Sequence, residues 1–339
     1  MCVVGLGGSG LSAVLRLVEL GRSVIGIDAE GVGAGAAGRN GGFFLAGAPA
    51  FHHRAGAAGL YRATLAELDR IELETPGVLR RTGSVRLASS PEEEDDCAAQ
   101  LAAMRADDLP AEPYEDKDGR GLLFPADGAG DPLARCRRLA ATAITAGAAL
   151  YQATPALAIE PGRVTTPSGV IACERAIVAV DGGLERVVPE LAGRVRSTRL
   201  QMLATAPDPT VHIPRPVYAR WGFDYWQQLP DGRVAGGGLR DRFADEEWQQ
   251  PAVPTEHVQH ALESMLRERT GVRAPVTHRW AGTVAFTSEA DPARLPIAEE
   301  VRPGVFAIGA YSGTGNVLGA LYGRAAADWT VTGELAIRW

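Results

Sequence analysis

Three glycines near the start of the chain, Gly5, Gly7 and Gly10, have the spacing of a phosphate-binding turn. They stand between a short apolar run, residues 2–4, and a segment whose apolar residues recur at helical spacing. Such a strand–turn–helix unit brings bare backbone and the positive end of a helix to a pyrophosphate. Asp28 ends the next predicted strand, at the distance where a carboxylate binds ribose hydroxyls. The motif predicts a dinucleotide site and leaves NAD and FAD open.

Two further glycine-rich loops favour FAD. Residues 33–42 follow the ribose acid directly and are long enough to run beside an extended cofactor, which a nicotinamide-binding fold does not ordinarily need. Residues 309–316 open a helix whose N-terminal amides would stabilise negative charge on a reduced flavin. Three loops around one elongated ligand therefore predict FAD.

A cluster of aromatic residues is the predicted substrate wall. Strand alternation places Trp221, Phe223 and Tyr225 on one face and Trp226 on the other. An aromatic face suits an alkyl ammonium through cation–π attraction, although ordinary sheet-core packing explains the same residues equally well. The candidate catalytic or substrate-contacting residues of the whole chain are Tyr225, Tyr311, Trp226, Arg220 and His52.

Other titratable groups give weaker signals. His52 follows the second glycine loop, where a solvated histidine is the alternative. His257 and His260 share one helix face but have no third ligand in the sequence, so we expect no metal. Asp224 and Asp241 could attract a cationic amine or simply be solvated.

Alternating elements must position these residues. At roughly 150 residues per domain, 339 residues predict two domains or one large one. We expect a buried strand over 175–180 and a linker over 112–130. Apolar periodicity and capping residues predict the remaining helices at 57–73, 91–108, 132–146, 255–271 and 316–330, and strands at 81–88, 150–159, 163–166, 196–205, 217–226, 233–239 and 305–308. The first predicted strand is so short that we expect the N-terminal start of the sequence to have lost one or two residues.

Composition excludes several classes of protein. A net charge of −7 without a basic block makes nucleic acid an improbable partner. Four cysteines without paired spacing indicate neither a disulfide framework nor zinc, and no apolar run has the length of a membrane span. We therefore expect a cytoplasmic protein that uses neither membrane nor nucleic acid. Lys117 is the only lysine, so lysine chemistry elsewhere is excluded.

The glycine loops, together with residues 280–283, 295–297 and 310–316, resemble the D-amino-acid oxidase superfamily of FAD-dependent amine oxidoreductases. The resemblance is strongest to gamma-glutamylputrescine oxidase-like and glycine oxidase-like members. With the loops, it gives the expected FAD contacts: Gly5, Gly7, Gly8, Ser9, Gly10, Asp28, Ala29, Gly35, Ala36, Gly38, Arg39, Asn40, Gly41, Gly42, Pro155, Ala156, Val180, Gly182, Trp280, Gly282, Tyr311, Ser312, Gly313, Thr314, Gly315 and Asn316.

The resemblance implies an α/β fold: a Rossmann-like FAD domain of the glutathione-reductase type and an α+β substrate domain built on an antiparallel sheet. We expect the FAD domain to comprise residues 1–78, 127–193 and 294–339, and the substrate domain 79–126 and 194–293. The implied reaction is hydride transfer from an amine-bearing carbon to flavin N5. The imine then hydrolyses, and O2 or another acceptor reoxidises the flavin.

Departures from the family pattern bear on substrate and cofactor attachment. Similar carboxylate-binding members carry an arginine where Val284 and Ala285 stand, which favours an amine over an amino acid, unless Arg220 or Arg240 replaces that anchor. No cysteine follows Cys173, so we expect non-covalent FAD. The preferred reading is oxidation of a small or polyamine-type amine. A D-amino-acid or glycine oxidase, a tRNA-modifying flavoprotein, an NAD-dependent dehydrogenase and a non-catalytic flavoprotein stay open, as does the oligomeric state.

Overall fold

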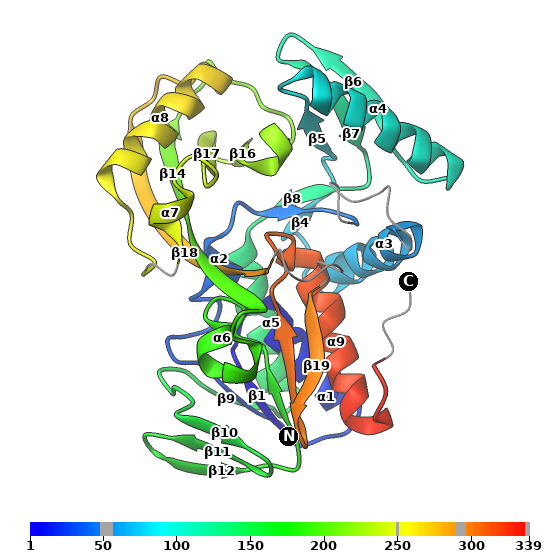
Figure 1. Ribbon diagram of the computed structural model, residues 1–339, viewed down its shortest axis with the longest axis vertical. Helices are drawn as coiled ribbons and strands as arrows, with labels where there is room; N and C mark the ends of the chain where they lie inside the picture. The colour runs from blue at the N-terminus through cyan, green and yellow to red at the C-terminus, as the bar shows by residue number, and fades with distance from the viewer. Residues whose placement is uncertain (48–56, 249–250, 289–295, 336–339) are drawn as a thin grey trace.

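The computed structural model of the chain describes residues 1–47, 57–248, 251–288 and 296–335 (Figure 1). The predicted site residue His52 lies outside these described ranges. The lower half of the molecule in Figure 1 holds a sheet with helices α1, α5 and α9, and the upper half holds strands flanked by α8 and α4. The long strands β14 and β18 reach from the upper half down toward the lower one.

The lower half is built on a six-stranded sheet in the order β19-β20-β13-β1-β2-β9, parallel except for β19. Its central strand β1 is buried on both faces, as expected when helices cover a parallel sheet. Its strands are Ile297–Arg302 (β19), Val305–Gly309 (β20), Ala176–Val178 (β13), Cys2–Val4 (β1), Ile25–Ile27 (β2) and Ala149–Tyr151 (β9). A small antiparallel sheet lies beside it: Ala158–Glu160 (β10), Arg163–Thr166 (β11) and Gly169–Ala172 (β12).

Three helices of this half pack around one core: α1 (Gly8–Glu19), α5 (Pro132–Thr145) and α9 (Gly315–Thr332). Helix α9 lies directly against α1 because Gly323 has no side chain. A Cβ there would lie 2.1 Å from the Ser9 carbonyl oxygen. The close contact brings the N-termini of α1 and α9 to the same end of the sheet (Figure 1). The predicted strand–turn–helix unit and the strand that follows it are confirmed, and the two strands pair in parallel.

The upper half is built on an eight-stranded sheet in the order β18-β14-β17-β16-β15-β5-β7-β6. All neighbours are antiparallel except β15 and β5. The strands are Val276–Thr287 (β18), Val195–Pro207 (β14), Arg233–Gly238 (β17), Asp224–Gln228 (β16), Val217–Ala219 (β15), Ser84–Leu87 (β5), Gly119–Phe124 (β7) and Glu112–Asp116 (β6). The helices of this half are α4 (Pro91–Ala106), α7 (Ala244–Glu247) and α8 (Glu256–Thr270). The short helix α6 (Leu184–Val187) lies in the lower half, where Leu184 packs in the core of the six-stranded sheet, and it contacts β14.

Short elements join the two halves. Strands β3 (Phe43–Phe44), β8 (Gly128–Gly130) and β4 (Leu79–Arg80) form a small sheet. Helices α2 (Ala36–Arg39) and α3 (Ala57–Glu74) complete the structure. The expected α/β fold with a parallel sheet and a second, largely antiparallel sheet is confirmed.

Two sequence predictions about the upper half were wrong. Residues 112–130 are not a linker, because β6 and β7 form a hairpin at the edge of the eight-stranded sheet. Residues 217–226 are not one strand, because a turn at Arg220–Gly222 separates β15 from β16. Arg220 and Trp221 have φ of 48° and 57°, which breaks the alternation used to place Trp221.

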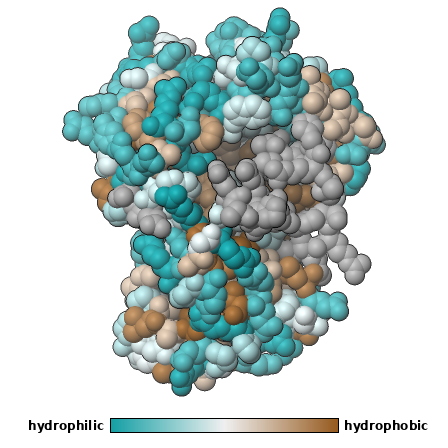
Figure 2. All heavy atoms as spheres, viewed as in Figure 1, coloured by the Kyte–Doolittle hydropathy of each residue, from teal (hydrophilic) through white to brown (hydrophobic). Residues whose placement is uncertain are grey.

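The surface has no membrane-spanning element in its described part. No helix among the described residues is long and apolar enough to cross a membrane. The face in Figure 2 is largely hydrophilic over the upper half, and apolar residues gather near the centre of the lower half. All four cysteines are free thiols.

Candidate active site

A cavity of about 1520 Å³ lies between the two sheets and is lined by segments from both. A pocket for a drug-sized ligand usually measures roughly 300–1,000 Å³, so this one has room for an extended cofactor and a small substrate. The predicted site residues that line it are Gly5, Gly7, Gly8, Ser9, Asp28, Ala29, Gly35, Ala36, Arg39, Asn40, Gly41, Pro155, Ala156, Val180, Gly182, Tyr225, Gly282, Tyr311, Ser312, Gly313, Thr314, Gly315 and Asn316.

Some glycines of the first turn line the cavity, and others allow close packing of the backbone. Gly5 has a φ of +102°, and a Cβ on it would lie 2.6 Å from the Ala179 carbonyl oxygen. A Cβ on Gly10 would lie 1.9 Å from the Gly5 carbonyl oxygen, so Gly10 lets α1 start against the turn and does not line the cavity. Gly7 and Gly8 line the cavity at the N-terminus of α1, which has no acidic residue in its first turn. This end of the helix therefore suits an anion.

Asp28 is fixed at the end of β2 by backbone amides. Its Oδ2 accepts a hydrogen bond from the Leu6 N–H at 2.8 Å, and its Oδ1 accepts from Glu30 and Gly31, each at 2.9 Å. A carboxylate has about four acceptor positions, so capacity for ribose hydroxyls is left. The glycine turn and the carboxylate are thus positioned by the same contacts.

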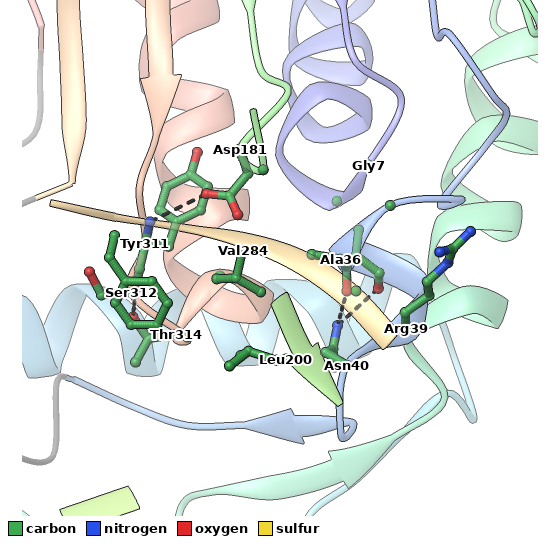
Figure 3. Close-up of a pocket in the computed structure, with 18 of the residues that line it drawn as sticks. Gly7, Ala36, Arg39, Asn40, Asp181, Leu200, Val284, Tyr311, Ser312 and Thr314 are labelled. Atoms are coloured by element: carbon green, nitrogen blue, oxygen red, sulfur yellow. Dashed lines mark hydrogen bonds between the residues drawn. The ribbon is translucent and has the colours of Figure 1, made fainter. Parts of the chain in front are cut away.

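An asparagine pair ties the second glycine loop to helix α9. The Asn40 Nδ2 donates to Asn316 Oδ1 at 3.1 Å, and Asn316 Nδ2 donates to Asn40 Oδ1 at 2.9 Å. Asn40 also donates to the carbonyl oxygens of Ala36 and Ala37, the first of which is drawn in Figure 3. The two asparagines therefore hold two predicted loops together while they line the cavity.

Asp181 organises the third loop. Its carboxylate accepts hydrogen bonds from the backbone N–H groups of Ala310 at 2.9 Å, Tyr311 at 3.4 Å and Ala285 at 3.2 Å. Burial raises the pKa of Asp181 to about 6. In Figure 3, Leu200 and Val284 lie between this loop and the segment that carries Ala36 and Asn40. Asp181 thus joins β18 to the start of the α9 loop.

The lining contains buried polar atoms that have no partner among the described residues. One is Nε of Arg135, a residue of α5 that is only 2% exposed. A Cβ on Gly8 would lie 2.9 Å from the Arg135 Nη1, so this cation lies beside the anion-binding turn. The phenol oxygen of Tyr218 is another such atom. Unsatisfied groups around a glycine-lined cavity fit a bound dinucleotide, whose phosphates and hydroxyls supply the missing partners.

Aromatic residues line the other end of the cavity. Tyr225 lies between the two ends of the cavity. On one side it is close to the second glycine loop, since a Cβ on Gly41 would be 3.5 Å from the Tyr225 ring. On the other side, the charge of Arg240 acts on the Tyr225 phenol. Burial raises the pKa of the Tyr225 phenol to about 12, so it is a proton donor near neutral pH. Trp221 and Phe223 also line the cavity. Trp221 does so from the turn rather than from a strand.

Several predicted site residues lie outside the cavity lining. Trp226 is in the core of the upper half, where strand alternation placed it, on the face opposite Tyr225. Arg220 forms ion pairs with Asp224 and Asp241, each at 2.8 Å. Gly38 and Gly42 make close backbone approaches, and the Trp280 Nε1 donates to the Arg39 carbonyl oxygen at 2.7 Å. These contacts shape the loops around the cavity.

Some residues that line the cavity were not predicted from the sequence as site residues. Asp181 had a readable signal, since it directly follows a buried strand of a parallel sheet, where ligands bind. Arg135 had none, because a lone arginine in an amphipathic helix is ordinarily solvated. Arg196 and Trp248 become neighbours only across the folded sheet.

The chain belongs to the family of FAD-dependent oxidoreductases named DAO, whose pattern matches residues 1–329. It is therefore an enzyme of the oxidoreductase class that uses FAD, and the resemblance noted from its sequence is confirmed. It is 29% identical to the "Probable oxidoreductase OrdL" of Rhizobium meliloti (strain 1021), over 97% of this chain and 82% of that protein.

Solved structures share the fold. Glycine oxidase from Geobacillus kaustophilus superposes with a TM-score of 0.83 at 18% identity, over 99% of this chain and 95% of that one. L-proline dehydrogenase from P. horikoshii superposes with a TM-score of 0.79 at 18% identity, over 100% and 95%. At this identity the likeness describes architecture.

Proposed function

We propose that this protein oxidises a C–N bond of a small amine or amino acid with non-covalently bound FAD. The observation that carries the proposal is one continuous cavity with glycine loops at one end and aromatic side chains at the other. A bound dinucleotide and a small organic substrate can therefore meet inside it.

In this proposal one end of the cavity binds FAD and the other end binds the substrate. The amides at Gly7 and Gly8 bind the pyrophosphate, Asp28 accepts hydrogen bonds from ribose, and the N-terminus of α9 faces the ring system. When bound, FAD supplies the hydride acceptor at N5, and the imine product hydrolyses in water. Tyr225 and Tyr311 orient the substrate against the ring and exclude water from it.

The domain division proposed from the sequence assigns residues 1–78, 127–193 and 294–339 to the FAD domain. The six-stranded sheet lies entirely within these ranges. Residues 79–126 and 194–293 form the proposed substrate domain, which holds the eight-stranded sheet. The cytoplasmic location and the use of O2 as acceptor stay predictions. Among the described residues no group of three metal-ligating side chains exists.

The test is the visible spectrum of the purified protein under anaerobic conditions, before and after addition of amines and amino acids. We expect a flavin spectrum that bleaches with at least one C–N substrate, and release of the flavin on denaturation with acid. A protein without flavin would contradict the cofactor assignment. A flavin that stays oxidised with every amine and amino acid, yet bleaches with dithionite, would contradict the proposed reaction.

A further inference from the structure

Two of the four free cysteines, Cys2 and Cys173, are in contact although they are far apart along the chain. Cys2 is the first residue of β1, and Cys173 directly follows β12. Both pack in the same apolar core on one face of the six-stranded sheet, and the Cys2 thiol donates a hydrogen bond to the Cys173 sulfur. The spacing of the cysteines in the sequence did not indicate this pair.

The backbone on both sides fixes the position of the two thiols. Cys2 lies opposite Ala176 of β13 in the parallel sheet, and its N–H donates to the Arg175 carbonyl oxygen at 3.0 Å. The Cys173 N–H donates to the Gly162 carbonyl oxygen at 3.0 Å, which holds the connection between β12 and β13 against the turn between β10 and β11. Regular hydrogen bonding, and not an exposed loop, therefore places the pair.

The two thiols differ in their access to solvent. Cys2 is completely buried, whereas Cys173 is partly exposed and stands between two exposed residues, Ala172 and Glu174. The hydrogen bond between the thiols raises the pKa of Cys2 and lowers the pKa of Cys173 to about 7. Since the thiolate is the reactive form of cysteine, the exposed member of the pair is the nucleophile near neutral pH.

We propose that Cys2 and Cys173 are a peroxide-reactive thiol pair that closes to a disulfide, with Cys173 as the attacking residue and Cys2 as the resolving residue. Such a disulfide joins the start of β1 to the connection between β12 and β13. Neither cysteine lines the cavity, so the inference does not depend on the proposed function.

The oxidant in this proposal is hydrogen peroxide, and the reaction has two steps. The Cys173 thiolate attacks one peroxide oxygen, the O–O bond breaks, and the departing hydroxide takes up a proton to form water, which leaves a sulfenic acid on Cys173. The Cys2 sulfur then attacks the Cys173 sulfur, the S–O bond breaks, and the hydroxyl group leaves with the Cys2 proton as water. The two thiols lose two electrons, and one peroxide is reduced to two waters.

The contact between the two sulfurs decides which oxidation product forms. A sulfenic acid without a neighbouring thiol can react with a second peroxide and become a sulfinic acid, whereas a thiol in contact converts it to a disulfide first. In the described part of the chain, no second cysteine shares a core cluster with Cys97 or Cys136. Burial raises the pKa of both of these thiols, to about 11 for Cys136, so we expect them to stay reduced.

The first experiment treats the flavin-bound protein with hydrogen peroxide in the absence of substrate, removes the excess with catalase, and counts thiols in denaturant. We expect the count to fall from four to two, and dithiothreitol to restore it. Trypsin cuts after Arg16, Arg163 and Arg175, so the unreduced digest should contain residues 1–16 joined to residues 164–175. The joined species should be lighter than the two separate peptides by two hydrogen atoms.

The second experiment compares Cys2→Ala with Cys97→Ala, which also removes one buried thiol. In Cys2→Ala the resolving thiol is missing, so peroxide should leave a sulfenic acid on Cys173 that dimedone traps, and no internal disulfide. In Cys97→Ala the count should fall from three to one, as the pair is intact. Oxidation should raise the urea midpoint of the wild type and of Cys97→Ala but not of Cys2→Ala, because the cross-link restricts the unfolded chain.

Four thiols after peroxide treatment, a cross-link to Cys97 or Cys136, or a loss of two thiols in Cys2→Ala would overturn the inference. A sulfinic acid on Cys173 beside a free Cys2 would overturn it as well. If Cys2→Ala fails to fold, Cys173→Ala serves as the second variant. It should keep three thiols before and after peroxide, and the loss of any of them would count against the inference.

Discussion

Arg135 is the residue whose environment depends most on what fills the cavity. It is almost fully buried beside Gly8, and its Nε has no partner among the described residues. An unpaired buried charge destabilises a folded protein unless a ligand neutralises it. We predict that Arg135→Met leaves the flavin-free protein at least as stable as the wild type and weakens FAD binding about 10–100-fold. Urea unfolding of the apoprotein and fluorescence titration with FAD measure the two effects, and lower stability with unchanged affinity would refute the prediction.

Asp127 should make stability depend on pH. It is buried, accepts hydrogen bonds from the Ala46 N–H at 2.8 Å and the Ser84 hydroxyl at 2.6 Å, and burial raises its pKa to about 7. Its folded pKa lies above its unfolded pKa, so its stabilising contribution is complete below about pH 4 and is lost as the pH rises through about 7. Asp127→Asn should flatten the fall of the melting temperature between these values.

The control for Asp127→Asn is Asp118→Asn, because Asp118 is exposed and the net-charge change is the same. Thermal melts from pH 4 to pH 8 compare the two variants with the wild type. Parallel curves for all three proteins would show that Asp127 does not titrate in this range.

At the scale of elements, a buried ion pair fixes α7 to β14. Arg199 and Glu247 are 6% and 3% exposed, and Nε lies 2.8 Å from Oε2. Loss of Arg199 leaves the Glu247 charge buried, since its other side-chain partner is the neutral Gln201 amide. We predict that Arg199→Met lowers the free energy of unfolding by about 3–5 kcal/mol.

The matched control is Arg194→Met. Arg194 pairs with Glu299, and both side chains are well exposed, at 46% and 39%. An exposed pair contributes only about 0–1 kcal/mol, so the two variants should differ clearly in urea unfolding. Equal losses in both variants would mean that burial does not set the strength of the Arg199 pair.

At the scale of the whole molecule, FAD should stabilise both halves together, because one cavity takes lining residues from both sheets. We predict about 2.7 kcal/mol of added stability when free FAD is 100 times its dissociation constant. A thermal melt with and without FAD measures this as an upward shift of the transition. Gly7→Ala should lose most of the shift, since its new methyl group would occupy the phosphate turn, 3.1 Å from the Ala37 Cβ.

Some residues of the site could be placed correctly from the sequence, and others could not. Gly5 and Gly7 could be placed from sequence because the turn, the helix and the following carboxylate are neighbours along the chain. Trp221 lines the cavity, but the strand alternation used to place it was wrong, since Trp221 reaches the cavity from a turn. Arg220 was expected near substrate, and its two acids instead hold it in ion pairs.

The sequence by itself determined the family, the cofactor and the class of fold, because these depend on local motifs whose glycines must meet a close backbone or phosphate. Tertiary structure alone decided which charged groups remain unpaired. Arg220 lies in the turn between β15 and β16, and Arg240 follows the end of β17; only the fold gives both nearby acids to Arg220. Ion pairing and aromatic stacking join residues that are far apart along the chain, so no local pattern carries that information.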